Sequence, residues 1–139
     1  GPYGGPMTGL PVSVPGVSAR VVMQIGCGPY AYIVVDFEPP GADGASEFLH
    51  TVREERLPHE FLPAVFEGIQ EGLGGVTARV RVTDGGFHEV DSRDDGYRLA
   101  GLYAGRAALA GAGLGPPPEN QGRRITVSRP GKPRPTAQT

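Results

Sequence analysis

The sequence predicts an α/β fold of two layers (α+β), in which one sheet of four to five strands is covered on one face by two helices. Three observations support this prediction. Residues 30–38 and 76–83 alternate apolar and polar side chains, as half-buried strands do. An apolar helical stripe lies between these two segments, and a second helical segment follows them. A chain of 139 residues has room for one domain with a modest core.

The first part of the domain is predicted to contain three strands. Residues 19–25 form an apolar run that ends at Gly26-Cys27-Gly28-Pro29. In the second run, the alternate positions from Ala31 to Phe37 are apolar and fall on one face. The short connection between these runs contains glycine and predicts a hairpin. After a turn rich in proline and glycine, residues 47–53 are predicted as a third strand.

A helix and a fourth strand are predicted next. The apolar residues of segment 62–73 form one stripe, and Pro63 fits its first turn, where no N–H partner is lost. Asp84-Gly85-Gly86 is predicted to turn the chain after the strand at residues 76–83. In that strand the alternation predicts Val76, Ala78, Val80 and Val82 pointing inward and Thr77, Arg79, Arg81 and Thr83 pointing outward.

The second helix is predicted to follow a loop at residues 87–91 and to run to about Ala110. Ser92 or Asp91 is expected to cap it, and two aspartates complement the dipole of its first turn. Its small face predicts a close approach to the sheet; this face contains Ala100, Gly101, Ala104, Gly105 and Ala108. Residues 124–129 are predicted as the last strand. The complete order is β-β-β-α-β-α-β.

Composition and charge divide the chain into a body and two ends. Residues 1–18 are predicted as a flexible leader rich in glycine and proline, residues 19–129 as the folded domain, and residues 130–139 as a flexible basic tail. Residues 1–121 hold eight Lys and Arg residues against fifteen acids, a net charge of −7. The remaining residues carry +5, from Arg123, Arg124, Arg129, Lys132 and Arg134. A basic tail of this kind either remains solvated or contacts phosphates.

Several classes of protein do not fit this sequence. It contains no apolar run near the roughly 18 residues of a membrane span and no secretory signal pattern. The single cysteine, Cys27, excludes an internal disulfide and a cysteine-based zinc site. We therefore expect a cytoplasmic protein that has no membrane contact, no metal, no cofactor and no small-molecule substrate.

Three segments resemble the fourth domain of elongation factor G, a family of translational GTPases that includes the tetracycline ribosomal-protection proteins. Residues 57–73 (LPHEFLPAVFEGIQEGL) are similar to the family segment that leads into the first helix. Residues 80–100 (VRVTDGGFHEVDSRDDGYRLA) are similar to its strand, aromatic-His-Glu-Val-Asp-Ser loop and second helix. Residues 30–39 (YAYIVVDFEP) match its second strand. The three segments occur in the family order.

The resemblance implies a left-handed βαβ crossover and a tip built from the loops at residues 26–30 and 87–92, with His88 at the extremity. In the family this tip enters the decoding centre of the small ribosomal subunit. The residues thereby implied in RNA or ribosome binding are Gly26, Cys27, Gly28, Tyr30, His88, Glu89, Asp91, Ser92 and Arg93. The sequence departs from the family in its shorter first loop, which lacks an arginine. It also lacks a phosphate-binding loop and any GTPase signature.

These observations leave three functional hypotheses. The first is a non-catalytic module that binds the small subunit and its RNA; the alternative is a module that has kept the fold and uses its acidic surface to bind a protein. An enzyme is the third, but the sequence contains no nucleophile-elbow or metal-ligand motif. His88 either contacts a phosphate, 2′-hydroxyl or base, or only fixes the turn through its ring.

Overall fold

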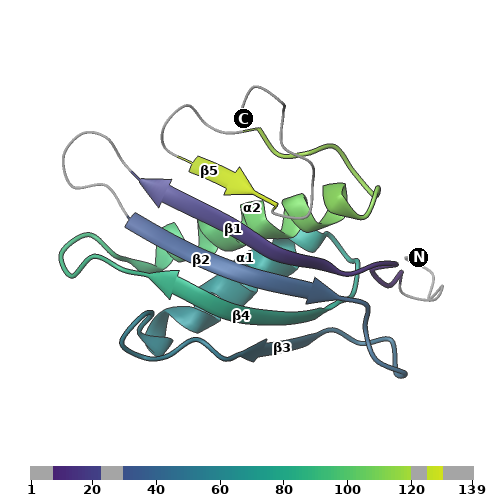
Figure 1. Ribbon diagram of the computed structural model, residues 1–139, viewed down its shortest axis with the longest axis horizontal. Helices are drawn as coiled ribbons and strands as arrows, with labels where there is room; N and C mark the ends of the chain where they lie inside the picture. The colour runs from purple at the N-terminus through teal and green to yellow at the C-terminus, as the bar shows by residue number, and fades with distance from the viewer. Residues whose placement is uncertain (1–7, 23–29, 120–124, 130–139) are drawn as a thin grey trace, which may run out of the picture.

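The computed structural model describes residues 8–22, 30–119 and 125–129. The predicted element order is confirmed (Figure 1). The elements are β1 (Val14–Val22), β2 (Tyr30–Glu38), β3 (Glu47–His50), the 3-10 helix η1 (His59–Phe61), α1 (Leu62–Leu73), β4 (Arg79–Gly86), α2 (Asp94–Gly111) and β5 (Ile125–Ser128).

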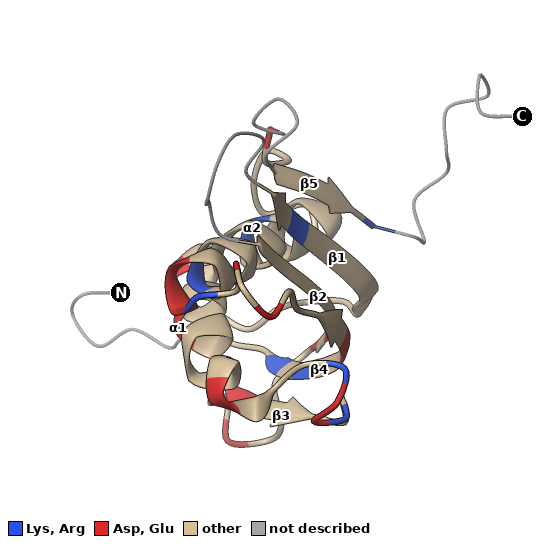
Figure 2. Ribbon diagram, turned by 90° about the vertical axis from the view of Figure 1, so that its left-hand side faces the viewer, with Lys and Arg blue, Asp and Glu red and all other residues tan. Residues whose placement is uncertain are grey.

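The strands form one mixed sheet, as predicted. Its order is β3-β4-β2-β1-β5, and every neighbouring pair is antiparallel except β3 and β4. Both helices lie on one face, behind the sheet in Figure 1 and beside it in the edge-on view of Figure 2. The parallel strands β3 and β4 are joined through α1 in a left-handed crossover (Figure 1). No helix in the described part of the chain is long and apolar enough to cross a membrane.

The core lies between the sheet and the helices and follows the alternation of the strands. The inward residues of β1, β2 and β4 are almost fully buried, and those of α1 face them. They include Val17, Ala19, Val21, Ala31, Ile33, Val35, Phe37, Val80, Val82, Val65 and Ile69. The strand residues between them point to the other face, which no helix covers and which is called the open face below (Figure 1).

The prediction that residues 1–18 form a flexible leader is wrong for the second half of that segment. Strand β1 begins at Val14 rather than at residue 19, and Leu10 is only 1% exposed. The amide nitrogen of Leu10 donates to the carbonyl oxygen of Thr77 at 2.8 Å. Thr77 is therefore buried instead of pointing outward as predicted. The glycine and proline content of this segment made the strand difficult to recognise in the sequence. In the structure Gly16, at φ 67°, forms part of a bulge between Val14 and the next paired residue.

Strand β4 also differs from its prediction, because Asp84-Gly85-Gly86 continues the strand instead of turning the chain. Gly85 pairs with Ile33, and Gly86 pairs with Tyr32. A Cβ atom on Gly85 would lie 2.8 Å from the carbonyl oxygen of Tyr32. Glycine at this position therefore permits a close approach of two strands. Strand β3 is shorter than predicted and ends at His50.

The small face of α2 packs on the sheet as predicted, but its glycines also approach the other helix, a contact that the sequence did not predict. A Cβ atom on any of four glycines would lie between 2.0 and 2.7 Å from a backbone oxygen of the opposite helix. These are Gly68 and Gly72 on α1 and Gly101 and Gly105 on α2. The alanines of the same face are buried in the core. The two helix backbones therefore meet directly.

Candidate functional site

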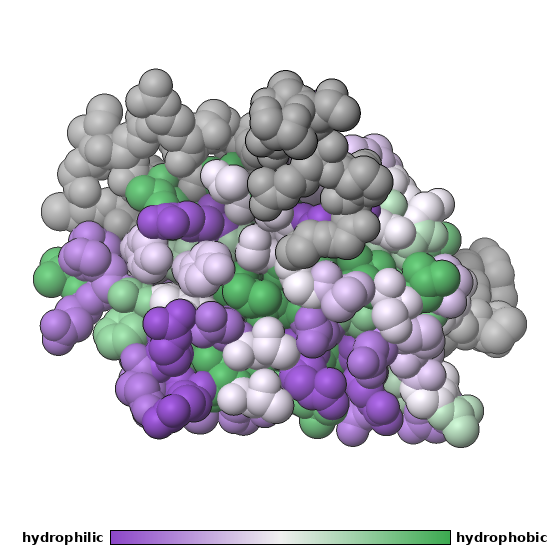
Figure 3. Space-filling view, viewed as in Figure 1, coloured by the Kyte–Doolittle hydropathy of each residue, from purple (hydrophilic) through white to green (hydrophobic). Residues whose placement is uncertain are grey.

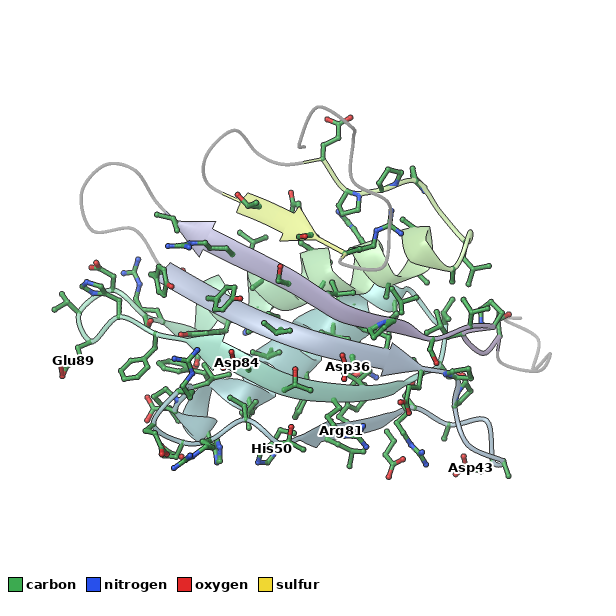
Figure 4. All side chains as sticks on the ribbon, in the orientation of Figure 1. Asp36, Asp43, His50, Arg81, Asp84 and Glu89 are labelled. Atoms are coloured by element: carbon green, nitrogen blue, oxygen red, sulfur yellow. The ribbon has the colours of Figure 1, made fainter. Side chains whose placement is uncertain are left out.

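The candidate site is the end of the molecule where β1 ends, β2 begins and the loop of residues 87–92 joins β4 to α2 (Figure 1). This end is called the tip below, and Glu89 lies at its extremity in Figure 4. The predicted site residues that the structure brings together here are Tyr30, His88, Glu89, Asp91, Ser92 and Arg93. Gly26, Cys27, Gly28, Arg123, Arg124, Lys132 and Arg134 lie outside the described residues.

Arg129 is the one predicted tail residue that the structure describes. It follows β5, and its guanidinium lies beside Gly111, at the end of α2. The tip adjoins the beginning of α2, so the two sites are separated by the length of an 18-residue helix. Arg129 is therefore not part of the tip.

Ser92 joins the loop to the sheet. Its Oγ accepts a hydrogen bond from the amide nitrogen of His88 at 2.8 Å and donates to the carbonyl oxygen of Tyr30 at 3.0 Å. Its own amide nitrogen donates to the carbonyl oxygen of His88 at 3.0 Å. The loop is thus closed on itself and tied to the first residue of β2. Ser92 does not cap α2 as predicted, because the N-cap residue is Arg93.

Tyr97 supports Ser92 from the first turns of α2. Its side chain is fully buried, and its hydroxyl donates to the carbonyl oxygen of Gly86 at 2.7 Å and lies 3.2 Å from Ser92 Oγ. Its ring stacks on Phe61 with the centroids 4.4 Å apart. Burial raises the pKa of the Tyr97 hydroxyl to about 12. The hydroxyl therefore stays protonated and can donate over the physiological range.

His88 stands on this fixed loop with its side chain 58% exposed. Its Nδ1 lies 3.4 Å from Oδ2 of Asp91, an ion pair when the ring is protonated. Its ring meets the ring of Tyr30 edge-on, with the centroids 6.3 Å apart. The amide nitrogen of Tyr30 in turn donates to the carbonyl oxygen of Asp91 at 3.0 Å. The turn is therefore held mainly by the backbone and Ser92, which leaves the outer edge of the imidazole accessible.

Two further features of the tip were not singled out in the sequence. Val90 is 80% exposed, the most exposed large apolar residue of the described chain. Arg20 of β1 places its guanidinium carbon 5.7 Å from the centroid of the Tyr30 ring, within the range of a cation–π contact. The sequence carried a signal for Tyr97 as well, since a tyrosine on the buried side of a helix needs a hydrogen-bond partner for its hydroxyl.

Charges at the tip are mixed, with more carboxylates than cations. From residue 88 to residue 95 the basic side chains are His88 and Arg93. The acidic side chains are Glu89, Asp91, Asp94 and Asp95. Figure 2 shows both acidic and basic residues in the helical layer, and basic residues on β1 and β4. Within the described ranges, no three His, Cys, Asp or Glu side chains are arranged to hold a metal ion.

Comparison with known proteins agrees with this geometry. Residues 16–113 match the protein family described as "Elongation factor G, domain IV", from β1 to just beyond the end of α2. The chain belongs to the elongation factor G domain IV family. This match includes the tip loop at residues 87–92 and Tyr97, so the hydrogen bonds around Ser92 lie within the family domain.

A solved structure supports the same fold. The domain IV chain resembles a crystal structure of a protein from Thermus thermophilus with a TM-score of 0.59 and 22% sequence identity. The likeness covers 88% of this chain but only 18% of the other. This chain thus matches only a small part of that much longer Thermus thermophilus protein. Family and fold together make it a translation-factor-like module.

Proposed function

We propose that this domain is a non-catalytic module that binds the small ribosomal subunit through RNA contacts of its tip. The observation that carries the proposal is the loop at residues 87–92, which is fixed by Ser92 and Tyr97 while it exposes His88 and Val90. A loop ordered before binding loses little conformational entropy when it meets its partner.

The chemistry of the exposed groups suits RNA. The imidazole of His88 can donate a hydrogen bond to a phosphate or a 2′-hydroxyl, and it can stack on an unpaired base. Tyr30 lies beside it and offers a second aromatic ring. Val90, which is 80% exposed, offers an apolar contact for a base or sugar. No step of bond making or breaking is assigned to these residues.

The net charge of −7 over residues 1–121 opposes this interaction and sets its expected strength. RNA affinity depends on the cations that neutralise phosphates, and few cations lie at the tip. Binding by the isolated domain should therefore be weak and should fall steeply as the salt concentration rises. In a longer protein, neighbouring segments would hold the tip at its target and raise its effective concentration.

Co-sedimentation with purified small subunits tests the proposal. We expect the wild-type protein to pellet with the subunits at low salt and less at moderate salt, and His88→Ala to pellet several-fold less. His50→Ala is the matched control, because His50 lies on the edge strand β3, away from the tip (Figure 4). Absence of wild-type pelleting even at low salt would overturn the proposal for this chain.

One observation favours the alternative of a protein partner, namely the excess of carboxylates at the tip. Glu89→Gln separates the two functions, because the two partners carry opposite charges. Removal of this negative charge should strengthen binding to protein-free ribosomal RNA, whereas it should weaken binding to a basic protein surface. Binding to intact subunits that is absent with protein-free RNA and is weakened by Glu89→Gln would support the protein-binding alternative.

A further inference from the structure

The open face of the sheet carries aromatic and cationic side chains directly beside the tip. Arg20 of β1 lies opposite Tyr32 of β2 in the strand register, and Val22 lies opposite Tyr30. The strand neighbours of these residues are buried on the helix side, so Arg20, Tyr30 and Tyr32 point to the open face. Tyr30 also contacts the ring of His88. The contacts of Tyr30 with His88 and Arg20 therefore connect the described part of the tip to the open face.

We propose that this surface stacks the unpaired bases of a single-stranded RNA segment that continues from the tip. The inference rests on the proposed function and adds the class of RNA that the domain recognises. Two stacking positions are available, the ring of Tyr32 and the guanidinium of Arg20 above the ring of Tyr30. Unpaired bases stack on both aromatic rings and arginine guanidinium planes.

Gly86 keeps this surface accessible. It pairs with Tyr32 at the end of β4. A Cβ atom at Gly86 would lie 3.5 Å from Cδ2 of Tyr32 and 3.6 Å from the hydroxyl oxygen of Tyr30. A larger side chain at this position would therefore extend over the two tyrosines. Because the position is glycine, the flanks of both rings are left free for a ligand.

Most charged side chains of the open face have oppositely charged neighbours. Arg79 forms an ion pair with Glu47 at 3.0 Å, Asp84 forms one with Arg56 at 3.0 Å, and Arg81 lies opposite Asp36 in the register. Near the tip, Arg20 lies between a threonine and a tyrosine on the neighbouring strands. Within the described ranges, no carboxylate forms an ion pair with Arg20. Its guanidinium is thus available for a phosphate as well as for a base.

The composition of the open face fits RNA better than an apolar partner. In the space-filling view, polar and apolar residues alternate over the visible part of this face and form no single apolar patch (Figure 3). Duplex RNA would gain nothing from the tyrosines, because its bases are already stacked on one another. A single strand combines exposed bases with phosphates, and both find complementary groups here.

Fluorescence anisotropy with a labelled ten-nucleotide single-stranded RNA, and with the same strand in a blunt duplex, tests this inference. We expect Tyr32→Ala to weaken single-strand binding about tenfold, the loss of one stacked base. Tyr32→Phe, which keeps the ring, should bind like the wild type. Arg20→Gln should weaken binding, and the charge-matched control Arg106→Gln, on the exposed side of α2, should not.

Thermal unfolding of each variant verifies that the fold is intact, and Tyr32→Phe and Arg20→Gln keep the test valid if Tyr32→Ala is unstable. Equal binding by wild type and Tyr32→Ala, or duplex binding as tight as single-strand binding, would overturn the inference. The outcome of the sedimentation experiment does not depend on the outcome of this one. If His88→Ala loses subunit binding while Tyr32→Ala retains both subunit and single-strand binding, only the stacking surface is refuted.

Discussion

The helix interface and the tip both bring backbone segments close together, but they do so by opposite means. Between α1 and α2 the contact depends on the absence of side chains at four glycines. At the tip it depends on two hydroxyl groups, those of Ser92 and Tyr97, placed between three segments. The first contact is set by shape and has no tolerance for larger residues. The second is set by hydrogen bonds, which small substitutions weaken without a steric clash.

The largest effect is expected at the helix interface from Gly101→Ala. Its new Cβ atom would lie 2.3 Å from the carbonyl oxygen of Val65, so the helices must separate. We expect the free energy of unfolding to fall by about 3 kcal/mol, as in severe overpacking. By helix propensity alone, replacing glycine with alanine would raise stability by about 1 kcal/mol. The sign of the measured change therefore distinguishes helix propensity from the steric clash. Increased stability in urea unfolding would contradict direct backbone contact.

A smaller loss of stability is expected at the tip from Tyr97→Phe. The variant keeps the stacking on Phe61 but leaves the carbonyl oxygen of Gly86 without its donor, at a cost of about 2 kcal/mol. Hydrogen exchange at the amide of His88 should become faster, because the Tyr97 hydroxyl no longer holds Gly86, two residues before His88. Tyr103→Phe is the control, because the Tyr103 hydroxyl forms no hydrogen bond within the described part of the chain. Equal stability of the two variants would exclude a role for the Tyr97 hydroxyl.

High pH should affect the tip through the same hydroxyl. Burial raises the pKa of Tyr97 to about 12 in the folded state, whereas an unfolded tyrosine has a pKa of about 10. The resulting stability is fully present below pH ~10 and is lost as the pH rises to ~12, by roughly 2 to 3 kcal/mol. The fall of the free energy of unfolding across this pH range should be less steep in Tyr97→Phe than in the wild type. An identical slope in the two proteins would mean that Tyr97 is not the group responsible.

The smallest effect is expected from the ion pair that also joins the two helices. Arg98 Nε lies 2.7 Å from Oε1 of Glu67, and both side chains are about half exposed or more. Exposed pairs contribute little because solvent and salt screen them. Glu67→Gln should reduce stability slightly at low salt and not at high salt. A loss comparable to that of Gly101→Ala would show that charge, and not shape, holds the helices together.

The sequence was sufficient to predict the architecture because alternation and helical periodicity directly report which residues are buried. The helices α1 and α2 and the strand β2 were each predicted at or near their observed positions. Glycine was the main source of error. The glycines at positions 85 and 86 permit close strand pairing, but in a sequence they are indistinguishable from a turn. Helical periodicity likewise identified the small face of α2, but it does not reveal that a helix as well as the sheet covers that face.

The tip was predicted only in part, and mainly through family resemblance. That resemblance placed His88, Ser92 and Tyr30 in one site, and the structure brings them together. It did not assign the supporting role of Tyr97, which depends on the fold of three segments. Arg20 was also missed, because its contact with Tyr30 depends on the diagonal geometry of a hairpin, which alternation alone does not reveal.

The antiparallel pairing of β1 and β5 has a mechanical consequence. Val14, where β1 begins, and Arg129, just after β5, both lie against Gly111, at the end of the sheet opposite the tip. A pulling force applied through these two points would peel β5 from β1 pair by pair, beginning at Ser128, instead of shearing all pairs at once. The tip loop, whose hydrogen bonds lie at the other end, would bear none of this load until the edge strand had detached.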